Sequence, residues 1–95
     1  MRIVYDPAFL EKLKKVDVRI KKSLKERLLI FSKNPNDLQL DNHPLREGYQ
    51  GLRSIDITAD YRAIYKETEI GEEIVAYFVL FGTHDQLYGK VRKVT

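Results

Sequence analysis

The stretch YRAIYKETEIGEEIVAYFVLF (61–81) contains two runs rich in β-branched and aromatic residues, separated by the polar segment 69–72 with a glycine at position 71. Such runs on either side of a short glycine-containing loop are typical of a β-hairpin, because glycine adopts a positive φ without steric strain. We predict strands at residues 61–67 and 73–81. A third strand at residues 49–57 precedes them across the tight connection Thr58–Ala59, so the three form an antiparallel meander.

The first third of the chain predicts one strand and two helices. RIVY (2–5) is a short β-branched strand, and Asp6 and Pro7 after it suit the N-cap and the first position of a helix ending near Lys15. Asp17 is a second N-cap, and an apolar stripe marks a helix at residues 17–33, formed by Ile20, Leu24, Leu28 and Phe31. Asn34 and Pro35 end it, and the polar residues as far as Pro44 predict a loop.

This order predicts an α+β fold in a single domain spanning residues 1–95, with two helices on one face of a four-stranded sheet. Short connections reverse the chain at each step, so we expect the first strand to run antiparallel to its neighbour. Alternation along the strands predicts an outer face that carries Arg53, Ile55, Arg62, Ile64, Lys66, Ala76, Phe78 and Leu80. The face beneath the helices is then formed by Leu52, Ala63, Tyr65, Val75, Tyr77, Val79 and Phe81.

Composition limits the classes of function. A chain of 95 residues supports one small core, and the absence of cysteine excludes disulfides and thiolate metal sites. No apolar stretch is long enough to span a membrane or to form a signal peptide, so we expect a cytoplasmic protein without a membrane partner. Residues 1–33 hold ten Lys and Arg against four Asp and Glu, and the remainder holds seven against ten. This basic first third suits nucleic acid or an acidic protein segment, and an ordinary solvated helix face explains it equally well.

Few residues are candidates for chemistry. The chain has no GxSxG, P-loop, Rossmann or HExxH motif, and two histidines 41 residues apart without cysteine make a poor zinc set, so we expect no metal and no cofactor. What remains is acid-base chemistry by His43, His84 and Asp60, assisted by the cations Arg53, Arg62 and Lys66. These types suit metal-independent RNA cleavage, which needs a base for the 2′-hydroxyl, an acid for the leaving 5′-oxygen and cations for the developing charge.

Two segments, NHPLREGYQGLRSIDITADYRAIYK (42–66) and IVAYFVLFGTHDQLYG (74–89), resemble the RelE/StbE toxins of type II toxin-antitoxin modules, and within them the YafQ-like branch. The resemblance implies a ribosome-dependent endoribonuclease that cuts mRNA and is held inactive by an antitoxin that wraps it. It also implies that the basic helices meet ribosomal RNA, and that operator DNA is bound only through the antitoxin.

Carried over by position, the resemblance implies a catalytic set of His43, Asp60 and His84, with Arg62 stabilising phosphate. Tyr88 stands where a substrate-stacking aromatic is expected, and Arg53 and Lys66 are further candidates for substrate binding. Two departures concern this set: Asp56 stands where such toxins often have a histidine, and Leu80 where an arginine is frequent.

Each assignment has an ordinary structural alternative. His84 suits a cap or a surface position, His43 a loop, Asp60 a turn, and Tyr88 a packing contact. The function has alternatives as well. A ParE-like inhibitor of DNA gyrase shares the expected fold and acts by binding alone, and a simple nucleic-acid-binding module needs only the basic helices. His84 and Asp60 distinguish these classes, since a gyrase inhibitor does not need an acid-base histidine after its last strand.

Overall fold

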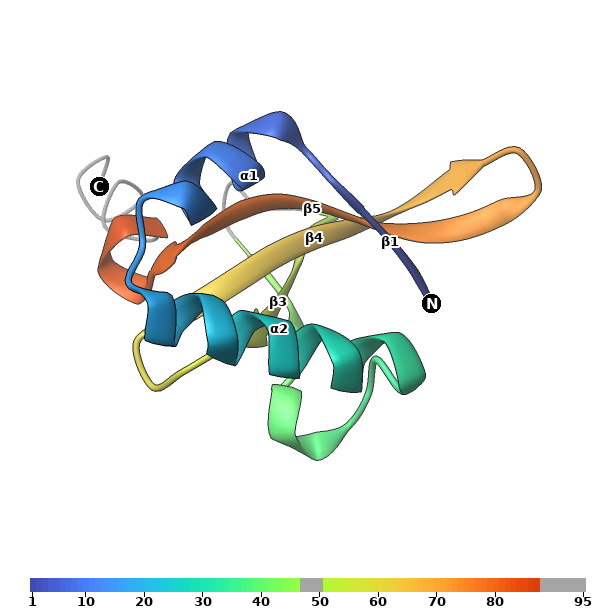
Figure 1. Ribbon diagram of the computed structural model, residues 1–95. Coiled ribbons are helices and arrows are strands. Elements are labelled where there is room, and N and C mark those ends of the chain that lie inside the picture. The colour runs from blue at the N-terminus through green and yellow to red at the C-terminus, as the bar shows by residue number, and fades with distance from the viewer. Residues whose placement is uncertain (47–50, 88–95) are drawn as a thin grey trace.

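The computed structural model describes residues 1–46 and 51–87, in which two helices cover one face of a five-stranded sheet (Figure 1). The helices are α1 (Pro7–Lys14) and α2 (Val18–Lys33), and the short 3-10 turn η1 follows at Leu38–Leu40. The strands are β1 (Arg2–Tyr5), β2 (His43–Pro44), β3 (Arg53–Asp56), β4 (Tyr61–Ile70) and β5 (Glu73–Thr83). The predicted α+β fold, with one strand, a helical hairpin and an antiparallel meander, is confirmed. No described helix is long and apolar enough to cross a membrane.

Both helices begin at the aspartates that the sequence predicts as N-caps. Asp6 Oδ1 accepts a hydrogen bond from the Ala8 N–H at 2.9 Å, and Asp17 Oδ1 accepts one from the Arg19 N–H at 2.6 Å. These bonds satisfy N–H groups that have no partner within the first helical turn. The Tyr77 hydroxyl also donates to Asp6 Oδ2 at 2.6 Å, and this bond is the main reason that the pKa of Asp6 is lowered. The start of α1 is thereby joined to β5.

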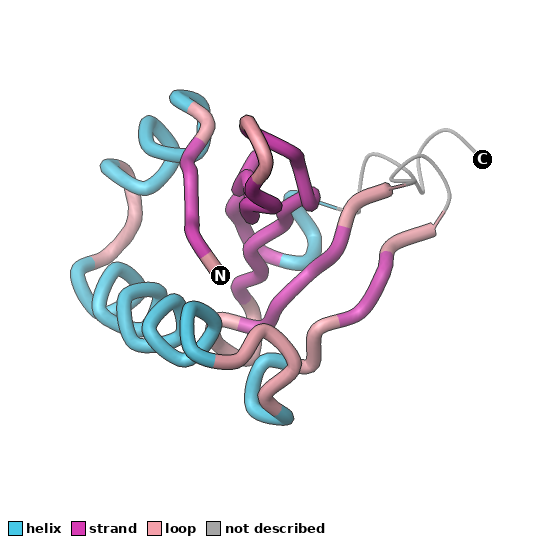
Figure 2. The backbone as a smooth tube through the Cα atoms, turned by 90° about the vertical axis from the view of Figure 1, so that its right-hand side faces the viewer, coloured by secondary structure: helices cyan, strands magenta, loops and turns pink. Residues whose placement is uncertain are grey.

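β1 lies at one edge of the sheet and runs parallel to β5, in the order β1-β5-β4-β3-β2. The predicted antiparallel pairing of the first strand is therefore wrong. The cause is β2, two residues in the predicted loop that pair antiparallel with β3. Because each short connection reverses the chain, one additional strand after α2 reverses β3, β4 and β5 relative to β1. The sheet consequently has five strands instead of the predicted four. Figure 2 shows both helices on the same side of this sheet.

The pairing of β3 with β4 also differs from the predicted alternation. Ile55 lies opposite Ala63, and the Ile57 N–H donates to the Tyr61 carbonyl across the connection. The turn therefore spans residues 58–60, one residue more than predicted. A shift of one residue exchanges the two faces of a strand. Ile55 accordingly lies in the core beneath the helices and not on the outer face.

A β-bulge in β5 causes a second difference. Ile64 pairs with Leu80, but Tyr65 pairs with Phe78, which leaves Val79 as an extra residue. On the N-terminal side of this bulge, the residues of β5 that face the helices are the ones predicted to face outward. Phe78 and Ala76 therefore lie in the core. Seven residues are predicted to lie beneath the helices. This prediction is correct for Ala63, Tyr65 and Phe81, and it is wrong for four residues that lie outside the core cluster, Leu52, Val75, Tyr77 and Val79.

The face of the sheet away from α1 and α2 is called the distal face below. Residues on one face alternate along a strand and lie opposite one another across strands. The distal face therefore carries His43 of β2, Ser54 and Asp56 of β3, and Arg62, Ile64 and Lys66 of β4. Arg62, Ile64 and Lys66 lie on the predicted face, but Ile64 is fully buried there and does not face solvent.

Aromatic rings fill the core between the helices and the sheet. Phe78 is fully buried, and its ring centroid lies 5.7 Å from that of Phe9, 5.4 Å from that of Phe31 and 5.1 Å from that of Tyr65. These residues come from α1, α2, β4 and β5, so one ring is in contact with both helices and with the sheet.

Candidate functional site

His84 directly follows β5 and begins a helical turn at residues 84–87. Thr83 Oγ1 accepts a hydrogen bond from the Gln86 N–H at 3.1 Å, and Gln86 Oε1 accepts one from the Thr83 N–H at 3.0 Å. This reciprocal pair is a capping box, which fixes the point where the strand becomes a helix. Gly82 leaves room for it, because a Cβ at this position would lie 2.8 Å from Gln86 Oε1. The sequence also predicts a short helical turn at residues 83–89, and the described part of this turn is confirmed.

A surface cavity of about 280 Å³ lies beside His84, and it is lined by Asp60, Tyr61, Thr83, His84 and Asp85. The backbone N–H of His84 donates to the Asp60 carbonyl at 2.9 Å, which joins the helical turn to the β3–β4 connection. The His84 side chain is 48% exposed, and its Nδ1 lies 4.0 Å from Asp85 Oδ1. The structure thus brings two of the predicted catalytic residues to one solvent-accessible cavity.

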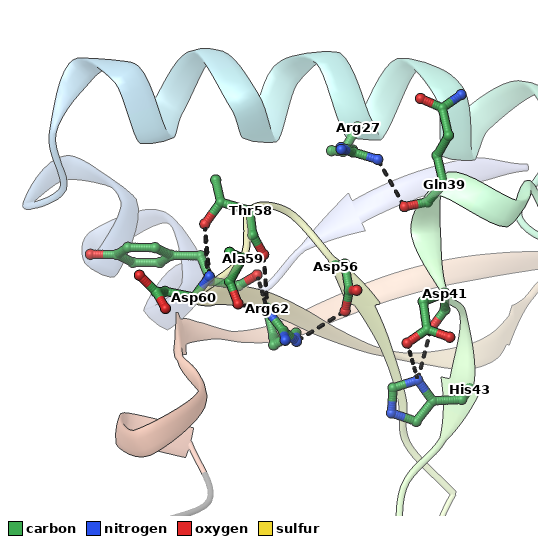
Figure 3. A network of polar contacts seen from close by, with 10 residues as sticks. Arg27, Gln39, Asp41, His43, Asp56, Thr58, Ala59, Asp60 and Arg62 are labelled. Carbon is green, nitrogen blue, oxygen red and sulfur yellow. Dashed lines mark hydrogen bonds and ion pairs between the residues drawn. The ribbon is translucent and has the colours of Figure 1, made fainter.

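Arg62 of β4 lies opposite Gly82 of β5, the residue before the capping box. Arg62 is therefore on the strand next to the one from which the helical turn begins. Its Nη1 donates to three carbonyls of the β3–β4 connection, those of Thr58 at 3.0 Å, Ala59 at 3.1 Å and Tyr61 at 3.1 Å (Figure 3). Its side chain is 18% exposed. The guanidinium is therefore held in one position by the same turn that carries Asp60.

Asp56 lies opposite Arg62 on the distal face. Its Oδ1 is 2.9 Å from Arg62 Nε, but the N–H is not directed at this buried oxygen, so the contact is an ion pair without a hydrogen bond. Burial raises the pKa of the Asp56 carboxyl, and the positive charge of Arg62 opposes this shift only in part. The site therefore contains a carboxylate whose charge is poorly compensated.

His43 lies on β2, at the opposite edge of the sheet from β1. Its Nδ1 is 2.7 Å from the Asp41 carbonyl (Figure 3). Because a carbonyl oxygen accepts only, this contact requires a proton on Nδ1 and leaves Nε2 as the proton acceptor of the neutral ring. Three strand spacings, about 14 Å, separate β2 from β5. His43 consequently shares the distal face with Asp56 and Arg62 but does not line the cavity of His84.

The other predicted substrate-binding residues do not gather around this cavity. Arg53 lies opposite Tyr65, on the helix-covered side, and its Nε donates to Asn42 Oδ1 at 2.8 Å, so its predicted outward position is wrong. Lys66 Nζ lies 5.8 Å from the centre of the Tyr77 ring. It is five residues along β4 from the cavity, about 17 Å for an extended strand. Tyr88 lies outside the described residues.

The site as a whole is a row across one end of the sheet. It runs from His84 and Asp60 through Arg62 and Asp56 to His43, and is called the polar row below; Figure 3 shows its members from Asp60 to His43. Imidazole and carboxyl groups transfer protons near neutral pH, and a fixed guanidinium stabilises negative charge. Within residues 1–46 and 51–87, no cluster of three or more His, Asp or Glu side chains is arranged to hold a metal ion.

Two features of the site were missed by sequence reasoning. The ion pair of Asp56 with Arg62 depends on the register of β3 with β4, which the pattern predicts with an error of one residue. The capping box had a readable signal, since Thr83 followed three residues later by glutamine is one form of that motif.

Comparison with known proteins gives structural neighbours only. No protein-family model and no curated protein sequence matches the chain. YafQ from E. coli strain BL21(DE3) superimposes with a TM-score of 0.74 at 26% identity, over 94% of this chain and 100% of that one. The YoeB/ParE toxin from Agrobacterium tumefaciens gives a TM-score of 0.70 at 20% identity, over 88% and 99%. The toxin-antitoxin complex RelBE2 from Mycobacterium tuberculosis gives 0.70 at 19% identity, over 87% and 96%.

Proposed function

We propose that the chain is the toxin of a type II toxin-antitoxin system and an mRNA interferase, and its structural likeness to YafQ at 26% identity supports this proposal. In this function it acts in the cytoplasm and cleaves mRNA on the ribosome by metal-independent acid-base chemistry. The observation that carries the proposal is the cavity shared by His84 and Asp60, with the fixed guanidinium of Arg62 one strand away.

The members of the polar row supply the groups that such a reaction needs. A base removes the proton from the 2′-hydroxyl, whose oxygen attacks the adjacent phosphorus, and an acid protonates the 5′-oxygen as it leaves. His84 fits one of these two roles, because its imidazole is half exposed at a rigid strand end. Arg62 fits the stabilisation of charge on the phosphorane. Asp60 and His43 supply further proton-transfer groups at either side of the arginine.

A second surface supports the proposal of an antitoxin partner. A groove of about 420 Å³ lies between β1, α1 and α2, and is called the helix groove below. Its lining is mostly apolar and includes Leu10, Leu24 and Leu29, and the two cations Lys21 and Lys25 also line it. Leu10 and Leu29 are 43% and 57% exposed. Such a groove suits an amphipathic segment with apolar anchors and acidic neighbours, as expected of an antitoxin that neutralises a basic toxin.

We expect Leu29→Glu to weaken binding of the cognate antitoxin at least tenfold, because it places a carboxylate in the apolar helix groove and repels an acidic segment. The measurement is titration calorimetry with the purified antitoxin. Leu38→Glu is the matched control, since Leu38 is 96% exposed and does not line the groove. Equal weakening by both substitutions, or by neither, would contradict this use of the groove.

The basic helices are also proposed to meet ribosomal RNA. Lys21, Lys22 and Lys25 are exposed on α2, and their charge attracts phosphate groups. Antitoxin and ribosome then compete for one side of the toxin, and operator DNA is reached only through the antitoxin.

Expression of the chain in growing cells without its antitoxin tests the proposed function. We expect growth arrest with mRNA cut inside reading frames, and intact chromosomal DNA. The alternative, a ParE-like gyrase inhibitor, predicts DNA breaks with intact mRNA. We retain this alternative because the YoeB/ParE toxin has the same fold. A gyrase inhibitor that acts by binding, however, does not need the proton-transfer groups of the polar row.

A further inference from the structure

The ion pair of Asp56 with Arg62 creates a conflict at the proposed phosphate site. Arg62 Nη1 donates to three carbonyls, and Arg62 Nε lies 2.9 Å from Asp56 Oδ1. A phosphate that approaches this guanidinium therefore also approaches the carboxylate. Both side chains are more than half buried, with exposures of 18% for Arg62 and 32% for Asp56, so water screens the repulsion between the two anions only weakly.

Protonation of Asp56 removes this conflict. A carboxyl that is partly buried and receives no hydrogen bond at Oδ1 gains little from its charge. Its pKa is already raised in the free protein. A second negative charge at the same guanidinium raises it further, because Arg62 then neutralises phosphate as well as the carboxylate.

We infer that Asp56 is a positioning residue for Arg62 and that it takes up a proton when an RNA phosphate binds there. The inference rests on the proposed function and adds a regulatory property to that site. The carboxylate of Asp56 neutralises part of the charge of the guanidinium in the free toxin, and its protonation leaves the full positive charge of Arg62 to the substrate. RNA binding is therefore weaker at higher pH over the range in which Asp56 ionises.

Other charged groups around Asp56 set the direction of this effect. Arg62 on β4, His43 on β2 and Arg27 on α2 favour the carboxylate, whereas Asp41, two residues before His43, disfavours it. Burial is the largest single influence, and the pKa of Asp56 is raised. His43 lies on the same face of the sheet, so the contribution of Asp56 is isolated by a variant.

The test is titration calorimetry of the purified toxin with a 2′-O-methyl oligoribonucleotide, which binds but lacks the attacking hydroxyl. We expect proton uptake, measured in two buffers of different ionisation enthalpy, and an affinity that falls by as much as tenfold per pH unit for one linked proton. In Asp56→Asn we expect this dependence to become shallower and the affinity at neutral pH to rise about tenfold, because the neutral amide does not repel phosphate. Glu67→Gln, at an exposed position on the neighbouring strand β4, controls for the change in net charge.

The outcomes separate this inference from the proposed cleavage. Binding by the wild-type toxin without proton uptake overturns the inference, with no need for a variant, and leaves cleavage intact. The same proton uptake in Asp56→Asn as in the wild type overturns it as well. Proton uptake that Asp56→Asn loses, in a toxin that cuts no mRNA, supports the inference and rejects the nuclease. A toxin that does not bind the free oligonucleotide at all overturns the inference and leaves cleavage on the ribosome intact.

Discussion

Replacing His84 by alanine is expected to lower the rate of mRNA cleavage about 10²- to 10⁴-fold, the usual loss when one general acid or base is removed. The reason is the position of the imidazole, half exposed beside the cavity that it shares with Asp60. The fold should survive, because the bond from residue 84 to the Asp60 carbonyl uses the backbone N–H, which alanine retains. The measurement is the single-turnover rate of cleavage in a cell-free translation reaction, followed by primer extension.

Glu72→Ala is the control for this prediction, since Glu72 is exposed in the turn between β4 and β5 at the far end of the hairpin. We expect it to cut at the wild-type rate. If His84→Ala also cuts at the wild-type rate, His84 takes no part in proton transfer and the role of the cavity is rejected.

Replacing Phe78 by alanine is expected to lower the free energy of unfolding by about 3–5 kcal/mol, as for other fully buried phenylalanines. Its ring contacts Phe9 of α1, Phe31 of α2 and Tyr65 of β4, so the cavity left behind is bordered by rigid elements on several sides. Small domains are stable by about 5–15 kcal/mol, so this one substitution removes a large part of the total.

The measurement is urea denaturation followed by circular dichroism. Ile74→Ala, on the same strand but 46% exposed, is the matched control, and we expect a loss of about 1 kcal/mol. Equal losses for the two variants would show that the aromatic cluster around Phe78 does not determine the stability of the fold.

The sequence predicts the local elements well because their signals are local. Asp6 and Asp17 are caps at the positions where the helices begin, and the apolar stripe from Ile20 to Phe31 faces the sheet. The direction of β1 could not be predicted in this way. It depends on β2, which has two residues and no periodicity, and whose pairing with β3 is visible only in three dimensions.

The same limitation applies to the faces of the strands and to the site. The extra residue at Val79 and the turn at residues 58–60 each change the alternation by one position. These changes place Phe78 in the core and Arg53 on the helix-covered side. His84, Asp60 and Arg62 are candidates that the residue types and the family resemblance supply without knowledge of the register. The pairing of Asp56 with Arg62 required the register.

The chemistry of the cut ends tests the central claim most directly, that the polar row cleaves RNA by attack of the 2′-hydroxyl. mRNA from translation reactions containing the toxin can be examined for the groups at each new terminus. We predict a 2′,3′-cyclic phosphate, or the 3′-phosphate formed from it, on the upstream fragment and a 5′-hydroxyl on the downstream fragment. A 3′-hydroxyl with a 5′-phosphate would contradict the account, because these ends arise from attack by water and not by the 2′-oxygen.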